Sequence, residues 1–192
     1  GDWDSAQTIT ITGVDDDLDD GDIGFNIVTA GATSSDGDYD GMVVDDVAVT
    51  NTDDDTAGFT LTPTTLTSIE NDTDQTFTVV LDSEPTADLT IGIASNDTTE
   101  GAVDKATLTF TSADWDSPQT VTVTPQDDSD FDGDITYSIV TTADSVTADT
   151  NYSGLDPADV SVTNEDDEIV QVDLGVKTDG AEAGPTNITF EA

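Results

Sequence analysis

Clusters of carboxylates are the residues of this sequence that could most readily do chemistry. Four dense acidic runs, at 15–22, 53–55, 127–134 and 165–168, each adjoin a segment of strand-like composition. Ca2+ prefers carboxylate oxygens and takes roughly six to eight oxygen ligands at about 2.3–2.6 Å. Carboxylates held together without a cation repel one another, and their pKa values rise. We therefore expect calcium to bind where these runs converge.

An internal repeat relates the four runs in pairs. Residues 3–21 match residues 115–133 without a gap, at a spacing of 112 residues. After a slip of one residue the match ends with 47–51 against 160–164, each followed by acidic residues. The candidate ligands are therefore Asp127, Asp128, Asp132, Asp166, Asp167 and Glu168 in the second copy, and Asp15, Asp16, Asp20, Asp53, Asp54 and Asp55 in the first.

The overall charge restricts the partners. The chain has 44 acidic residues against two basic ones, which gives a net charge of −42. Binding of nucleic acid phosphates needs a basic face, so nucleic acid is excluded as a partner, and an anionic membrane surface is disfavoured. The acidity has two interpretations: metal sites, or a hydrated acidic surface adapted to high salt.

Catalysis and membrane insertion find no support in the sequence. Without histidine or cysteine the chain lacks the usual general bases and nucleophiles, so we expect no enzyme. It also has no disulfide and no apolar run of the ~20 residues that a membrane span requires.

Apolar residues alternate with threonine at the period of a half-buried strand. Residues 56–168 show seven such segments separated by turns, which predicts one complete antiparallel two-sheet sandwich. The segments are 58–62, 75–81, 89–95, 105–111, 119–124, 135–141 and 159–163. Residues 1–55 repeat only the last three, at 8–12, 23–28 and 47–50, and are interpreted as the C-terminal half of another sandwich.

Residues 169–192 are interpreted as the start of a further, divergent repeat. Two alternatives for the incomplete ends stay open. Either the chain is part of a longer tandem array, or the tail of one subunit completes the half-domain of the next in a fibre.

Four aromatic residues are interpreted as packing residues. Trp3 and Trp115 each precede an expected core strand, where packing is more common than stacking on a sugar. Tyr39 and Tyr152 are expected to close one end of a sandwich. Asp36 and Asp144, in the loops beside these tyrosines, are expected to affect neither calcium affinity nor stability.

The complete repeat resembles the Calx-β domain of sodium–calcium exchangers and of large bacterial surface proteins. The similarity lies in residues 108–124, in Asp127-Asp128 and Asp132, and in the closing run 165–168. It implies a seven-stranded, immunoglobulin-like Greek-key sandwich. It also implies calcium ligands at a glutamate after the first strand (Glu70), at the Asp-Asp pair and at the terminal acidic triplet. Asp132 stands where the family often has glutamate.

Three functions are compatible with these observations. The first is a calcium-stabilised structural repeat of an extracellular surface protein, in an adhesin stalk or a fibre, whose partners are neighbouring repeats or head-to-tail subunits. The second is an adhesive module that binds glycan or protein. The third is an acidic matrix protein that collects calcium.

Overall fold

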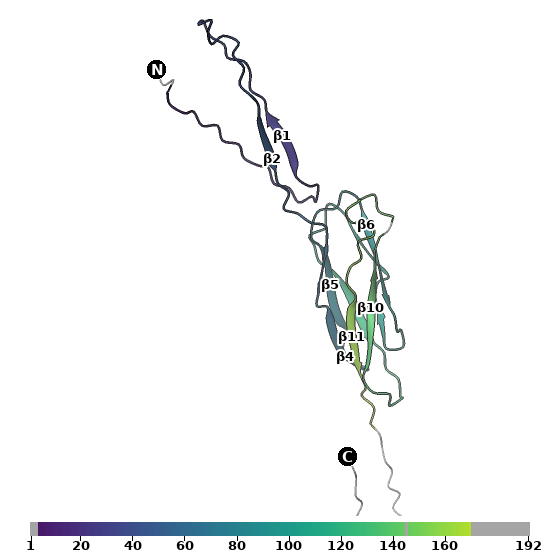
Figure 1. The fold of residues 1–192 in the computed structure, drawn as a ribbon. Coiled ribbons are helices and arrows are strands. Elements are labelled where there is room, and N and C mark those ends of the chain that lie inside the picture. Colours follow the sequence, from purple (N-terminus) through teal and green to yellow (C-terminus); the bar gives the residue numbers. More distant parts are fainter. Residues whose placement is uncertain (1–3, 145, 170–192) are drawn as a thin grey trace, which may run out of the picture.

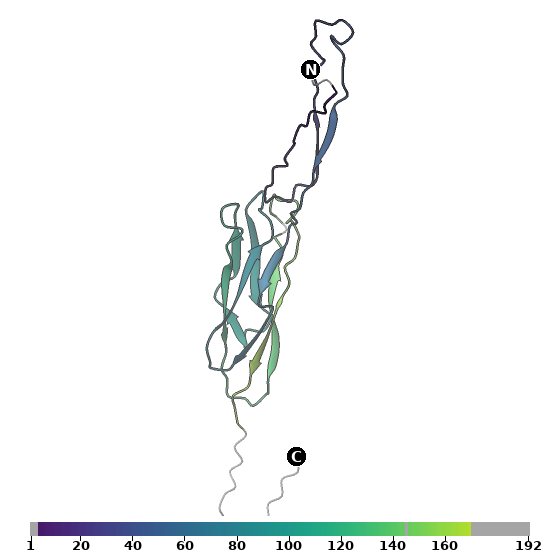
Figure 2. The ribbon, with the colours of Figure 1, turned by 90° about the vertical axis from the view of Figure 1, so that its left-hand side faces the viewer.

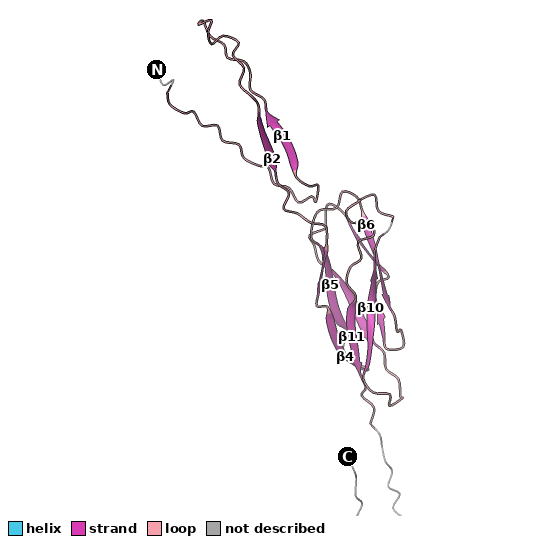
Figure 3. Ribbon diagram, viewed as in Figure 1, coloured by secondary structure: helices cyan, strands magenta, loops and turns pink. Residues whose placement is uncertain are grey.

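The computed structural model describes residues 4–144 and 146–169, and within these residues the chain forms strands and loops without a helix (Figure 3). In this part of the chain no helix is long and apolar enough to cross a membrane. The all-β prediction is confirmed.

Residues 59–165 form a sandwich of two sheets with Greek-key connections (Figure 1). One sheet has the strand order β3-β5-β9-β7 and the other the order β4-β11-β10-β6-β8. The strands are β3 (Phe59–Thr62), β4 (Thr65–Ile69), β5 (Gln75–Leu81), β6 (Leu89–Ser95), β7 (Gly101–Val103), β8 (Thr107–Phe110), β9 (Gln119–Pro125), β10 (Ile135–Thr142) and β11 (Val160–Glu165).

The alternation in the sequence places the core. In β5, Phe77, Val79 and Leu81 are buried and the intervening residues lie at the surface, and the other core strands follow the same pattern. The inward positions of facing sheets interdigitate in such a sandwich, which is why the apolar period of two predicted seven of its nine strands. Strands β4 and β7 were not predicted.

The first strand of the sandwich is divided between the two sheets. Pro63 has no N–H to donate, and the chain leaves β3 there and joins the other sheet as β4. Strand β4 runs parallel to β11, with Ile69 opposite Glu165, whereas the other strand pairs are antiparallel. This crossing was not predicted, and it delivers Glu70 to the end of β11.

Tyr152 closes the end of the sandwich opposite Glu70, as expected. The same expectation for Tyr39 is wrong, because its side chain is 59% exposed. The Tyr152 side chain is 1% exposed and contacts Phe59 edge-on at 5.6 Å. Its hydroxyl donates to the Ser83 carbonyl at 2.8 Å and accepts from the Ser83 N–H at 3.1 Å.

The N-terminal segment lies beyond that end of the sandwich (Figures 1 and 2). It contains one antiparallel pair, β1 (Ile23–Ile27) and β2 (Val47–Asn51). The strand predicted at 8–12 is absent, so that prediction is wrong. Its counterpart β9 pairs with β5 and β7, and the described residues contain no third strand beside β1 and β2.

Asp144 is a structural residue, which changes the expectation for its substitution. The residue is 8% exposed, and its carboxylate accepts backbone N–H groups from Thr90, Val146 and Thr147 at 2.8, 2.8 and 3.0 Å. These hydrogen bonds, that of Thr90 first, lower the pKa of Asp144.

We predict that Asp144→Asn lowers the free energy of unfolding by about 1–3 kcal/mol, because the new amide nitrogen replaces an oxygen that accepts N–H groups. The exposed Asp36 provides the control, and Asp36→Asn should stay within about 0.5 kcal/mol. Urea unfolding measures both. Equal effects would mean that the two carboxylates act through net charge alone.

Candidate metal centre

One end of the sandwich gathers carboxylates from separate parts of the chain. Glu70 follows β4, Asp127 lies near the start of the β9–β10 loop, and Asp167 and Glu168 follow β11. One carboxylate oxygen from each of these four residues lies within 4.8 Å of the others. This group is called cluster 1.

A second group lies at the same end. Glu100, Asp128 and Asp132 each offer an oxygen within 4.8 Å of the other two, and they are called cluster 2. Glu100 precedes β7, and its carbonyl accepts the Gln126 N–H at 2.9 Å. That bond fixes Glu100 beside the start of the acidic loop.

A buried asparagine connects the two clusters. The Asn164 side chain is 1% exposed, and its Nδ2 donates to Glu70 Oε1 at 3.5 Å, to Glu100 Oε2 at 3.3 Å and to the Gln126 carbonyl at 3.1 Å. The amide therefore serves one oxygen of each buried glutamate and leaves the others for further ligands.

Two carboxylate oxygens at this end are buried without a hydrogen-bond partner. They are Glu70 Oε2 and Glu168 Oε2, and Glu70 as a whole is only 4% exposed. A buried anionic oxygen without a donor loses its hydration uncompensated, which is strongly unfavourable. A cation placed among the carboxylates would satisfy both oxygens.

The same environment disturbs the protonation of the two glutamates. Burial raises the pKa of Glu70; the Asp128 amide partly opposes this, and the Asp128 and Glu100 carboxylates add to it. Burial also raises the pKa of Glu168 to about 7, with further contributions from its hydrogen bond to Asp166 and from the Asp167 charge.

Asp166 was predicted as a metal ligand, but its carboxylate binds backbone amides instead of joining a cluster. Its carboxylate accepts the Gly133 N–H at 2.7 Å and the Glu168 N–H at 2.9 Å, and it belongs to neither cluster. Gly133 has a φ of 79°, a conformation that favours glycine. Asp166 therefore ties the acidic loop to the end of β11. Its pKa is lowered despite the opposing effect of burial, because the amides of Glu168 and Gly133 stabilise the anion.

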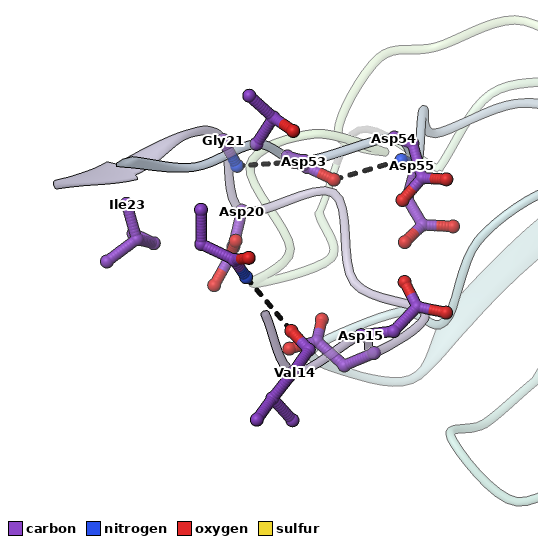
Figure 4. Close-up of a pocket in the computed structure, with 11 residues that line it drawn as sticks. Val14, Asp15, Asp20, Gly21, Ile23, Asp53, Asp54 and Asp55 are labelled. Carbon is purple, nitrogen blue, oxygen red and sulfur yellow. Dashed lines mark hydrogen bonds between the residues drawn. The ribbon is translucent and has the colours of Figure 1, made fainter. Parts of the chain in front are cut away.

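The predicted ligands of the first copy lie together but form no comparable cluster. They line an open pocket of about 50 Å³ (Figure 4): Asp15, Asp16, Asp20, Asp53, Asp54 and Asp55. Among the described residues, no three of these six bring oxygens within 4.8 Å of one another. Burial, then the charges of Asp54 and Asp53, raise the pKa of Asp55.

This pocket lacks the two glutamates that complete the other site. Among the described residues the lining of this pocket contains aspartates and no glutamate. Cluster 1 and cluster 2 each combine loop aspartates with one buried glutamate, so the first copy presents only the loop half of a site.

Sequence reasoning missed Glu100. A signal was available, because only seven of the 44 acidic residues are glutamates, and three of those seven lie in the clusters. The position of Glu100 in the sequence did not indicate this role, because its separation from Glu70 corresponds to no repeat or strand period of the chain.

The donor set determines which ions fit. The clusters offer carboxylate oxygens without nitrogen or sulfur ligands, which suits the hard cations Ca2+ and Mg2+. The described part of the chain supplies one cationic side chain, Lys105, and it pairs with Asp104 at 3.0 Å. No cationic side chain of the described residues therefore neutralises the clusters, and a cation from solution could do so.

The raised pKa values predict a stability that falls with pH in the absence of metal. The folded pKa of Glu168 is about 7 against an ordinary 4.5, so the folded state binds more protons than the unfolded state between these values. Stability in chelator should therefore decrease as pH rises from about 4.5 to about 7. Thermal melts at constant ionic strength measure this.

Two comparisons make that prediction specific. Glu168→Gln should reduce the decrease, and calcium should suppress it, because the metal binds the deprotonated carboxylates. Aspartates whose pKa is lowered in the folded state change the stability only below their ordinary pKa of 3.8, so they do not contribute to the decrease between pH 4.5 and 7. A flat profile in chelator between pH 4.5 and 7 would contradict the geometry of the site.

Comparison with known proteins gives structural similarities without a family assignment. The sequence matches no protein-family model and no curated protein. The apo form of the Calx CBD1 domain is similar, with a TM-score of 0.44, 19% identity and coverage of 57% of this chain and 96% of that one.

Two further solved structures are similar at the same level. CBD12 from CALX1.2 has a TM-score of 0.42 and 19% identity, and the match covers 57% of this chain and 44% of the CBD12 chain. The periplasmic chaperone SfaE has a TM-score of 0.42 and 10% identity, with 60% of each chain covered. At these identities and scores the similarities carry no information about ligands.

Proposed function

We propose that residues 56–168 form a calcium-binding structural repeat whose ions neutralise clusters 1 and 2 and thereby stabilise the sandwich. The observation that carries this proposal is Glu70, a residue that is 4% exposed and whose carboxylate has an unpartnered oxygen and faces other carboxylates. An acidic surface adapted to salt would keep its carboxylates hydrated.

The choice of calcium follows from the shape of the site. Its ligands come from flexible loops as well as from strand ends, and the rim residues Asp127, Asp128, Asp132 and Asp167 are exposed. Ca2+ accepts six to eight oxygens in irregular geometry, whereas Mg2+ demands a near-ideal octahedron at about 2.0–2.1 Å. Water and exposed carboxylates can complete a calcium shell here.

A role in an array is supported by the contact between the two copies. The acidic loop of the first copy reaches the Tyr152 end of the sandwich, where the Asp17 carbonyl accepts the Glu84 N–H at 2.7 Å. Asp19 Oδ2 accepts the Ala57 N–H at 2.8 Å. Ions bound in this loop would stiffen the junction, as a stalk or fibre of an extracellular surface protein requires.

The adhesive alternative finds less support. Trp115, the residue best suited to stacking on a sugar, is partly buried and packs against the core. Trp3 lies outside the described residues.

Calcium should raise the stability of the sandwich. Extracellular modules bind calcium at about 10⁻⁴–10⁻³ M, so 10 mM calcium contributes about 1.4–2.7 kcal/mol for each site. The melting temperature should rise by roughly 5–20 °C. Melts in calcium and in chelator, with sodium chloride added to match ionic strength, measure the rise. An equal midpoint in the two solutions would favour salt adaptation.

Removal of a buried ligand should weaken binding and stabilise the metal-free form. Glu70→Gln and Glu100→Gln each delete an anion from a crowded cluster, so we expect about tenfold or greater loss of calcium affinity together with a higher melting temperature in chelator. Asp116→Asn, at an exposed position outside both clusters, is the control. Calorimetric titration and melts measure these changes. Identical behaviour of all three variants would show that total charge, rather than a site, governs binding.

A further inference from the structure

The β1–β2 pair has the same register as β10–β11. Ile23 pairs with Asn51, as Ile135 pairs with Asn164 one repeat later. The slip of one residue between the copies falls in the connecting loop and leaves the pairing unchanged. The two pairs therefore present equivalent residues on the same face.

These equivalent residues differ in burial. Phe25 is 42% exposed and Val47 is 52% exposed, whereas their counterparts Tyr137 and Val160 are 4% and 0% exposed. In the sandwich, β10 also pairs with β6, β11 also pairs with β4, and the other sheet covers their inner face. In the described residues β1 and β2 have none of these neighbours.

The loop between the strands is also preformed. The Gly41 N–H donates to the Ala32 carbonyl at 2.8 Å, and Gly154 makes the equivalent bond to Asp144 at 3.0 Å. The two glycines have φ values of 77° and 76°. This loop carries Tyr39, which is 59% exposed although its counterpart Tyr152 is buried against Ser83.

The acidic end of the first copy repeats the bonds of the complete site. The Asn51 side chain donates to the Val14 carbonyl at 2.9 Å, and the Gly21 N–H donates to Asp53 at 2.5 Å. These bonds correspond to those of Asn164 with Gln126 and of Gly133 with Asp166. The first copy is therefore organised to receive the missing glutamates.

We propose that residues 4–55 are a preformed back half whose open face and edges are covered by a further front half of the same repeat. A front half is a segment built like residues 56–114, with strands equivalent to β3–β8. It brings the two edge strands, a polar group for Tyr39 and the two buried glutamates. It is carried on the same polypeptide, in the order in which residues 56–114 precede residues 115–168.

Stoichiometry argues against a second copy of residues 1–192 as the occupant. Each copy contributes one front half, residues 56–114, and two back halves, residues 4–55 and 115–168. The segment interpreted as the start of a further repeat, residues 169–192, lies almost wholly outside the described residues. Its 24 residues are too few for the strands that a front half of 59 residues contains. Any exchange between such chains leaves as many open back halves as before, with no net gain in buried apolar area.

The test is a transplant within the full chain. Residues 116–164 are replaced by a second copy of residues 4–51, so that the existing front half has to fold around the first-copy sequence. The inward residues are matched in kind, and cores tolerate such volume-conserving exchanges. We expect a single cooperative unfolding transition, in calcium and in chelator, since the fit does not depend on the metal.

One substitution then shows whether the face is buried. Phe25→Asp is made separately in the transplanted copy and in the original copy. In the transplanted copy it should abolish the cooperative transition, because it buries an unpaired charge. In the original copy it should leave the midpoint unchanged.

Three results would overturn the proposal. The first is the absence of a cooperative unfolding transition in two chimeras. These are the transplant described above and a smaller one in which residues 23–51 replace residues 135–164. The second is a transplant that folds but tolerates Phe25→Asp. The third is a concentration-dependent assembly of the unmodified chain that Phe25→Asp abolishes, which would assign the face to the hairpin of a second copy.

Discussion

The repulsion among buried carboxylates at one end of the sandwich is the constraint on which the rest of the structure depends. Glu70 and Glu100 are held in place by strands that also form the core, so neither can swing into water without local unfolding. Folding therefore concentrates negative charge in a region of reduced hydration. The described residues include one lysine, which pairs with Asp104, and the whole chain has two basic residues against 44 acidic ones. The protein's own cations are therefore too few to balance these carboxylates, and dissolved cations can do so.

The fold supplies this constraint through its topology. The crossing of the first strand from one sheet to the other at Pro63 places β4 alongside β11, so that Glu70 meets the acidic residues that follow β11. Asn164, at the end of β11, holds one oxygen of each buried glutamate. A site of this kind exists only when both halves of the sandwich are folded, so the proposed binding of metal is coupled to folding.

Sequence reasoning predicted the features that depend on local patterns. The alternation of apolar and polar residues predicted most strands of the sandwich, because inward positions such as Phe77 and Val79 must be apolar whatever the topology. The internal repeat predicted that the aspartates of the acidic loops are candidate metal ligands. It could not find Glu100, whose role depends on a contact far along the chain, nor the parallel pairing of β4. The alternation of Ile9 and Ile11 predicted a strand that is absent, because a strand needs a neighbour as well as a pattern.

A crystal structure grown in calcium would test the central claim most directly, with the anomalous signal used to locate ions. The account predicts ions in both clusters, with one at about 2.3–2.6 Å from the Glu70 carboxylate. Water alone beside Glu70 and Glu100, at millimolar calcium and neutral pH, would contradict it.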